Sequence, residues 1–257
     1  MNHEGVHATL IDDSGGERDI TGEATFTLRD ARYGSVKDAT VTVNGQGAGP
    51  TRVIARYRDL TGDTELTVYV KQTIVDPDVD PGTPQQFAGA AEDPALAPTI
   101  AYPVEANLLP PNLGQFDVHW RHATANVFEI QLANTYIDIK RYTNGDDPSQ
   151  PFWTVFEPSQ WYPIASAREQ LAIEVTGMNT ADPTRKGRSP VRRVDVTNED
   201  ARGGIYYWTT TGLAGIWRVR IPVVGRPQIW VTPFRHPFQN VSTANHIAQW
   251  TQTVVGQ

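Results

Sequence analysis

Apolar and polar residues alternate along much of the first seventy positions, which is the pattern of antiparallel β-strands with one buried face. In TRVIARYR, for example, the arginines lie on the face opposite to Val53 and Tyr57. The positions predicted to face inward are Phe26, Leu28, Val41, Val43, Val53, Ala55, Tyr57, Leu66, Val68 and Val70. Between the last two strands, DLTGD places Gly62 beside two aspartates, which predicts a hairpin turn.

A second alternating pattern begins at residue 99. Its predicted inward positions are Phe116, Val118, Trp120, Phe128, Ile130, Leu132, Ile137, Ile139, Leu171, Ile173 and Val175. Asn144-Gly145 predicts a hairpin, and Pro158 suits the first position of a helical turn. GIYYW and GIWRVRI predict further strands, so about seven short strands indicate a sandwich.

The segment between the two patterns, DPDVDPGTPQQFAGAAEDPALAP, is rich in proline and shows no periodicity. Repeated proline keeps a chain extended, which predicts a semi-rigid linker. We therefore predict an all-β chain with two β-sandwich modules. The predicted parts are a first module at 1–75, the linker at 76–98, a second module at 99–222 and a C-terminal extension at 223–257.

Residues 19–70, DITGEATFTLRDARYGSVKDATVTVNGQGAGPTRVIARYRDLTGDTELTVYV, resemble a bacterial Ig-like domain of the group 2 type. Residues 97–221 resemble a fibronectin type III-like sandwich, and more narrowly one found in large surface proteins of myxobacteria. The stretches that carry this second resemblance are APTIAYPVEANLLPPNLGQFDVHWR, FEIQLAN, PSQW and GGIYYWTTTGLAGIWR. In those proteins an Ig-like module often precedes the sandwich, as it does in this chain.

These resemblances imply an extracellular or cell-surface location on a bacterium, although MNHEGVHATL has no signal-peptide pattern. Few residues precede the Ig-like pattern, so its first strand is expected to be missing. A sandwich without an edge strand can accept a strand from another chain. HIAQWTQTVV, within 223–257, is the candidate donor or docking tail, and head-to-tail contacts of this kind would build filaments or rings.

Composition narrows the function classes further. The hydrophobic content of 39% supports folded cores, and the net charge of −7 disfavours nucleic-acid binding. The absence of cysteine excludes disulfides and thiol chemistry within these 257 residues. No apolar run has the length of a transmembrane segment.

Motifs for catalysis are weak. NGQGAGP lacks the lysine of a phosphate-binding loop and is interpreted as a hairpin loop. Ser189 precedes a proline, which favours a surface loop over a nucleophile. His119 and His122 are three residues apart, so on a strand they point to opposite faces and do not chelate one metal. The sequence therefore predicts no enzyme.

Two charged clusters each allow two interpretations. Asp76, Asp78 and Asp80 alternate within the linker, where they are interpreted either as a solvated acidic segment or as a calcium site. Calcium is the one cofactor suggested. The basic run TRKGRSPVRR is interpreted as a solvated loop, with an anionic glycan or lipid surface as its alternative partner.

Aromatic residues concentrate in the second module. In GIYYW, strand alternation cannot bury Tyr206, Tyr207 and Trp208 on one face. Together with Trp161 they are predicted to form either an interface with a neighbouring domain or subunit or a sugar-binding platform. The favoured function is a non-catalytic structural or adhesion module that self-associates or contacts other domains of its parent protein. The alternative is carbohydrate binding or an accessory region of a surface enzyme.

Overall fold

The computed structural model describes residues 3–114, 116–122, 124–144, 152–209, 215–221 and 228–231. The chain divides into two compact units, Met1–Ala201 and Arg202–Gln257. Strands dominate the described residues, so the prediction of an all-β chain is confirmed. None of the helices in the described ranges has the length and apolar character that a membrane crossing requires.

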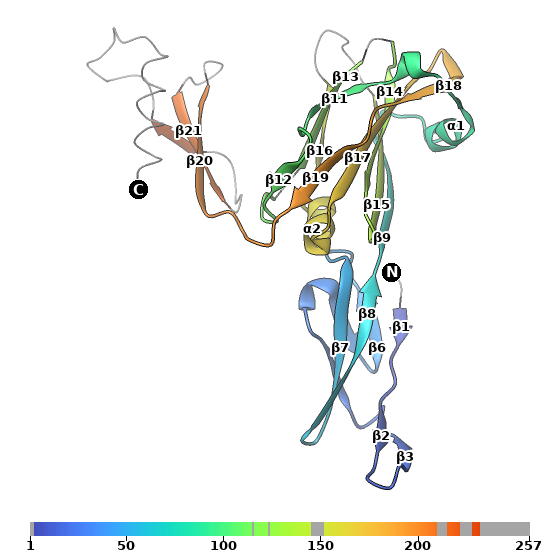
Figure 1. Ribbon diagram of the computed structural model, residues 1–257, viewed down its shortest axis with the longest axis vertical. Helices are drawn as coiled ribbons and strands as arrows, with labels where there is room; N and C mark the ends of the chain where they lie inside the picture. The colour runs from blue at the N-terminus through green and yellow to red at the C-terminus, as the bar shows by residue number, and fades with distance from the viewer. Residues whose placement is uncertain are drawn as a thin grey trace. The chain divides into compact units, whose positions relative to one another are not determined.

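The first module consists of short antiparallel strands at the N-terminal end of the first unit (Figure 1). Its elements are β1 (His3–Gly5), β2 (Thr9–Ile11), β3 (Glu17–Asp19), β4 (Thr25–Leu28), the 3-10 turn η1 (Ala31–Tyr33), β5 (Gly34–Lys37), β6 (Thr40–Val43), β7 (Gly49–Tyr57) and β8 (Leu60–Val68). They form two three-stranded sheets, β1-β6-β5 and β4-β7-β8, and the hairpin β2-β3. Val41 from the first sheet and Val53 from the second are buried. In β4, Phe26 and Leu28 are half-buried between exposed threonines, which confirms the predicted alternation.

The hairpin turn between β7 and β8 is not where the sequence placed it. Pairing runs from Gly49↔Val68 to Tyr57↔Leu60, so Arg58 and Asp59 form the turn. Arg58 takes the left-handed conformation with φ 52°. Gly62 instead lies inside β8, opposite Ala55. The prediction was wrong because an arginine, rather than the glycine, adopts the positive φ that the turn needs.

Residues before β4 contribute an edge strand to the sandwich. β1 pairs antiparallel with β6, with His3 opposite Thr42 and Gly5 opposite Thr40. No alternating pattern is recognisable here because β1 and β2 are each only three residues long. β1 is therefore an edge strand of the β1-β6-β5 sheet, formed by residues that precede the Ig-like pattern.

The second module is a two-sheet sandwich. Its elements are β9 (Val70–Val75), α1 (Thr83–Gly89), β10 (Ala91–Glu92), the 3-10 turn η2 (Pro94–Leu96), β11 (Thr99–Tyr102), β12 (Asn107–Leu109), β13 (Phe116–Arg121), β14 (Val127–Ala133), β15 (Ile137–Asn144), β16 (Phe152–Phe156), α2 (Pro158–Ala167), β17 (Leu171–Asn179), β18 (Asp182–Arg188) and β19 (Arg192–Val196). The larger sheet has the order β10-β18-β17-β14-β15-β9, with β19 paired to β17 and β12. The smaller sheet is β11-β13-β16.

The core of this module lies between the two sheets and α2. All of the positions predicted to face inward in β13, β14, β15 and β17 are at most 2% exposed. They pack with Trp161 and Ile164 of α2 in one cluster. Pro158 is the first residue of α2, as predicted, although the helix is longer than one turn. Period-2 alternation therefore predicted this core correctly.

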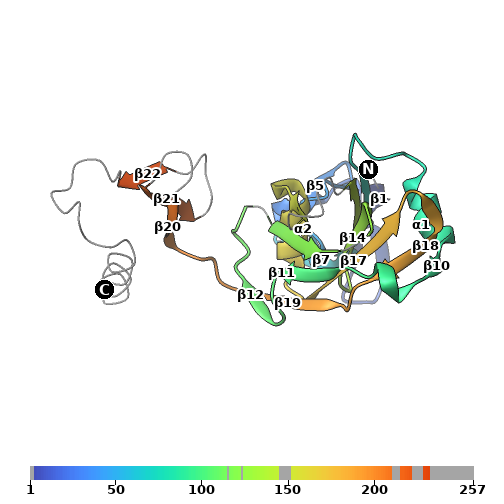
Figure 2. The same cartoon turned by 90° about the horizontal axis from the view of Figure 1, so that it is seen from above.

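Residues 76–98, named here the strap, fold onto the second module and are not an extended linker. Val79 and Phe87 of the strap are 5% and 2% exposed. They form a second apolar cluster with Val127, Tyr142 and Met178 of the larger sheet. Figures 1 and 2 show α1 beside β18, with β10 close by. The proline content misled the prediction because Pro84 and Pro94 lie in the first turns of α1 and η2, where a missing N–H costs nothing.

Two further boundaries differ from the predictions. β15 and β16 belong to different sheets, so the connection that begins after Asn144 joins the two sheets and is not a hairpin. GIYYW and GIWRVRI are β20 (Gly203–Thr209) and β21 (Gly215–Ile221), which form the sheet β20-β21-β22 with β22 (Gln228–Val231). This sheet belongs to the second unit and not to the sandwich. HIAQWTQTVV lies outside the described residues.

Candidate functional site

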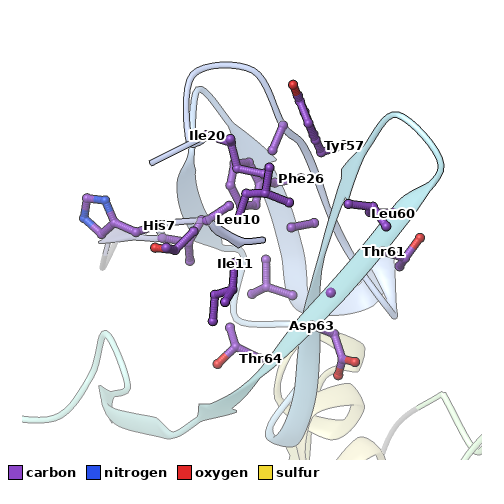
Figure 3. A pocket seen from close by; sticks show the side chains of 17 residues that line it. His7, Leu10, Ile11, Ile20, Phe26, Tyr57, Leu60, Thr61, Asp63 and Thr64 are labelled. Atoms are coloured by element: carbon purple, nitrogen blue, oxygen red, sulfur yellow. The ribbon is translucent and has the colours of Figure 1, made fainter. Parts of the chain in front are cut away.

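An apolar groove lies in the first module, between the β4-β7-β8 sheet and the segment that contains β2 (Figure 3). Its volume is about 400 Å³. The lining residues are Val6, His7, Ala8, Thr9, Leu10, Ile11, Ile20, Ala24, Phe26, Val53, Ala55, Tyr57, Leu60, Thr61, Gly62, Asp63 and Thr64. Leu10, Ile20 and Phe26 gather at its centre, whereas His7 points away (Figure 3).

The groove exists because the strand register places a glycine in its floor. Phe26, Ala55 and Gly62 lie side by side across β4, β7 and β8, and Gly62 has no side chain to fill the space. Leu60 at one end remains 50% exposed, and Ile11 on the opposite wall is 64% exposed. Apolar side chains left open in this way mark a surface that can bind another apolar group.

A second feature adjoins the groove. β8 is the last strand of its sheet, β9 is the last strand of the larger sheet, and Tyr69 alone separates them. We call residues 61–75 the long edge. Figure 1 shows β9 following β8 into the second module. In the described part of the chain, both strands are paired on one side only.

Hydrogen bonds show which side of the long edge is open. In the register with β7, the even-numbered residues of β8 bond inward. In β9, the N–H of Val70 donates to the Tyr136 carbonyl at 2.9 Å, and the next even-numbered residues follow the same pattern. Odd-numbered residues therefore direct their N–H and C=O groups outward along the whole edge. Tyr69, midway along it, is 68% exposed.

The loop between β6 and β7 contacts the second module. It was predicted as a hairpin loop, which is wrong because β6 and β7 lie in different sheets. Ala48 is fully buried within the core cluster of the second module. Its N–H donates to Ser166 Oγ of α2 at 2.7 Å, and Tyr33 Oη donates to its carbonyl at 3.1 Å. Gly49 follows with φ 102°, close to Ala167. The modules are thus connected at two places, the strand at Tyr69 and this loop.

The three aspartates of the predicted calcium site are engaged separately. The Asp76 carboxylate accepts from Arg141 at 3.0 Å, and both side chains are mostly buried. The Asp78 carbonyl accepts from Asn144 at 2.7 Å, and Asp80 accepts from the N–H two residues on at 2.6 Å. In the ranges that the structure describes, no three carboxylate or histidine side chains are grouped to hold a metal. Calcium binding by these residues stays a prediction for calorimetric titration.

Residues of the basic run bind the strap. The Arg185 guanidinium pairs with Asp93 at 2.8 Å. Lys186 Nζ donates to the carbonyl of Phe87 in α1 at 2.7 Å. β10 also pairs in parallel with β18. These bases therefore have partners within the chain and hold the strap on the larger sheet.

Charged side chains on the outer face of the larger sheet also pair with one another. Arg188 contacts Glu174 at 3.2 Å, and Lys140 contacts Glu129 at 3.3 Å. Burial raises the pKa of Glu174, and Arg188 opposes that shift. Burial, together with the hydrogen bond to Glu129, raises the pKa of Tyr142. These contacts neutralise the charges of neighbouring side chains within the sheet.

Trp161 does not belong to an exposed aromatic platform. It is fully buried, and its ring stacks on Phe116 with centroids 5.3 Å apart. Its Nε1 donates to the carbonyl of Pro111 at 2.9 Å. The prediction was wrong because Trp161 lies on the face of α2 that packs into the core. The backbones of Tyr206, Tyr207 and Trp208 lie in β20, and their side chains are outside the described part.

Ser189 and His122 both pack within the fold and not at a reactive site. Ser189 is 4% exposed, and its Oγ accepts from the N–H of Val175 at 3.1 Å, so the prediction of a surface loop was wrong. The ring of His122 lies 4.6 Å from that of Phe128. Burial lowers the pKa of His122. A neutral, packed imidazole is the state this environment favours.

Comparisons with known proteins add little. No protein-family model and no curated protein matches the chain. Among solved structures, it is similar to one titled "Structure of surface layer protein SbsC, domains 4-9". That alignment has 15% identity and a TM-score of 0.22, and it covers 84% of this chain and 31% of the other. Agreement this low carries no weight, so the fold rests on the strands and their pairing.

Sequence reasoning missed the groove and the long edge. A signal for the edge was present, because ELTVYVKQTIV contains many β-forming residues and no glycine or proline. An uninterrupted run of this kind indicates strand up to Val75, and in the structure its second half, β9, belongs to the second module and not to the first. No signal marked the groove, since it depends on Gly62 lying opposite Ala55 in the register.

Proposed function

We propose that this chain is a non-catalytic structural module of an exported bacterial surface protein, and that its first unit is a stiff pair of sandwiches. Its role is to hold attached parts at a fixed spacing and to assemble through its faces and edges. The cell-surface location is inferred from the resemblance of residues 19–70 and 97–221 to domains of such proteins.

The observation that carries the proposal is the double connection between the modules. A single strand passing between two domains allows them to swing. Here the loop at Ala48 is also buried in the second module and hydrogen-bonded to Ser166. The two connections flank the directly opposed residues Gly49 and Val68, so they lie side by side at one end of the β7-β8 ladder. Together they restrict the bending and twisting that a single connecting strand allows. A unit of this kind transmits orientation and force, which is what a structural spacer requires.

The polar clusters support the same interpretation. The Arg141–Asp76 and Arg185–Asp93 pairs tie the strap to the sandwich. Ordering a segment of this length costs about 1–2 kcal/mol per residue, so a function that depends on rigidity explains why it is fastened at several points.

Calorimetry of the full chain tests the proposal. Ala48→Arg places a long charged side chain at a fully buried position, so it should force the loop out of the second module. We expect the single transition of the first unit to separate into two. Gln46→Arg is the matched control, because Gln46 is exposed in the same loop. If Ala48→Arg unfolds like Gln46→Arg, the modules are not held by this contact and the proposal fails.

A further inference from the structure

We propose that the long edge pairs antiparallel with the long edge of a second copy, about a two-fold axis at Val68. This inference rests on the proposed function, since it specifies how the module assembles. The contact is isologous, because the same residues are used on both copies, and it therefore closes into a dimer.

The backbone supplies the first argument. β8 has nine residues and β9 has six, and among the described strands none pairs with the outward N–H and C=O groups of their odd-numbered residues. β1, β4 and β5, at the other edges of the first module, have three or four residues. Proteins commonly shorten, bend or cover an exposed edge, and a long open one is a template for another strand.

Charge provides the second argument and selects the register. With the axis at Val68, Glu65 lies directly opposite Lys71 of the second copy. Symmetry repeats this pair, so two opposite-charge pairs form in each dimer. Asp63 is already paired with Arg52. The Lys71 side chain is 83% exposed, and its one ion-pair contact among the described residues, from Nζ to the Asp138 carboxylate, is long at 3.9 Å. Lys71 is thus available to a carboxylate of a second chain.

The opposite face of the paired edges is mainly apolar in this register, apart from Thr64, which lies opposite Gln72. Leu66 lies opposite Val70 of the second copy, and the two Val68 residues face each other. Leu66 and Val70 are half-buried in the single chain, so pairing covers surface that is still open. Gly62 lies opposite Ile74, which brings an isoleucine to the mouth of the groove. Directly opposed apolar residues of this kind stabilise antiparallel strands.

Charge reversal tests the pairing in the full chain. Lys71→Glu places two glutamates opposite each other, and Glu65→Lys does the same with two lysines. By analytical ultracentrifugation we expect each variant to weaken dimerisation about 10-fold, and the double variant Glu65→Lys/Lys71→Glu to restore it. Lys37→Glu, on exposed β5, is the matched control and should dimerise normally. Melting temperatures measured alongside exclude loss of folding.

Cysteine cross-linking tests the register, because the natural chain has no cysteine. Glu65→Cys/Lys71→Cys should oxidise to a covalent dimer, since directly opposed residues in a hydrogen-bonded pair lie about 5.5 Å apart at Cα. Within one chain the two positions are about 20 Å apart and cannot bond. Asp63→Cys/Lys71→Cys is the shifted-register control and should remain uncross-linked.

Several results would overturn this inference. They are a full chain that stays monomeric at all concentrations, equal dimerisation of Lys71→Glu and Lys37→Glu, or cross-linking only in the shifted register. Deletion of residues 232–257 should leave the dimer intact, and its loss would assign the edge to the tail instead. The proposed function fails separately, in the calorimetry of Ala48→Arg, so a monomer with a coupled unit would refute only the dimer.

Discussion

Phe87→Ala tests whether the strap is part of the fold. The Phe87 side chain is 2% exposed, and its ring lies 5.4 Å from that of Tyr142. Removing a fully buried phenylalanine costs about 3–5 kcal/mol, which includes the cavity that remains. For a unit of this size, each kcal/mol lowers the melting temperature by about 2–4 °C. We therefore expect a decrease of roughly 6–20 °C, unless the strap alone detaches.

Two measurements separate these outcomes. Urea denaturation followed by tryptophan fluorescence gives the change in the free energy of unfolding. Hydrogen exchange read by mass spectrometry gives the protection of residues 76–98, which local detachment would abolish. Tyr162→Ala is the control, because Tyr162 on α2 is an aromatic residue that is 46% exposed. Its expected effect is within about 0.5 kcal/mol.

The reasoning is refuted if Phe87→Ala and Tyr162→Ala have the same stability and the strap exchanges rapidly in the unmodified protein. Residues 76–98 would then be the extended linker that their proline content predicts. Slow exchange that is lost in Phe87→Ala, even with a small change in global stability, would still place the strap on the sheet.

Three further predictions concern single side chains. Ser166→Ala removes the acceptor of the buried Ala48 N–H, so urea denaturation should show a loss of about 1–3 kcal/mol. Trp161→Phe removes the hydrogen bond to Pro111 and should cost a similar amount, and an unchanged midpoint would contradict the burial described here. Because burial raises the pKa of Glu174 above 4.5, the folded state keeps a proton that the unfolded state releases. Stability should therefore fall as the pH rises from 4.5 through the folded pKa, and Glu174→Gln should flatten this slope, whereas equal slopes would refute the assignment.

Alternation predicted the strands of the second sandwich well because one face of each strand is buried in the core and the other is partly exposed. Phe128, Ile130 and Leu132 are fully buried, and the residues between them are not. A period of two can be read from a few residues and needs no knowledge of the partner strand. The same was true of β4 and β7 in the first module.

Tertiary contacts decided what the sequence alone could not. The strap has linker composition, yet Phe87 packs in an apolar cluster with strand residues 40 or more positions away in the chain. Trp161 looked available for binding because helix orientation is set by packing and not by local pattern. The turn at Arg58 and the glycine at position 62 depend on strand register, which local signals leave open.

Candidate sites depend on tertiary contacts in the same way. The sequence-based hypotheses for Asp76 and the basic run rest on the chemical type of these residues alone. In the fold, Asp76 and Arg185 have partners that neutralise them. The long edge, by contrast, is a property of the backbone. β-forming residues in ELTVYVKQTIV indicate strand there, but only the pairing of β8 with β7 and of β9 with β15 shows which side of the strands is open.

Distance measurement between the modules tests the central claim, that they form one stiff unit. Spin labels at Lys37→Cys and Arg121→Cys place one probe on each module at exposed positions. The reference is Arg121→Cys/Tyr162→Cys, which carries both spin labels on the second module and gives the width of the distance distribution for two rigidly connected positions. In double electron–electron resonance, with labelled protein diluted in unlabelled protein, we expect the inter-module distribution to be as narrow as this reference. A distribution several times broader would show that the modules swing, and would contradict the account.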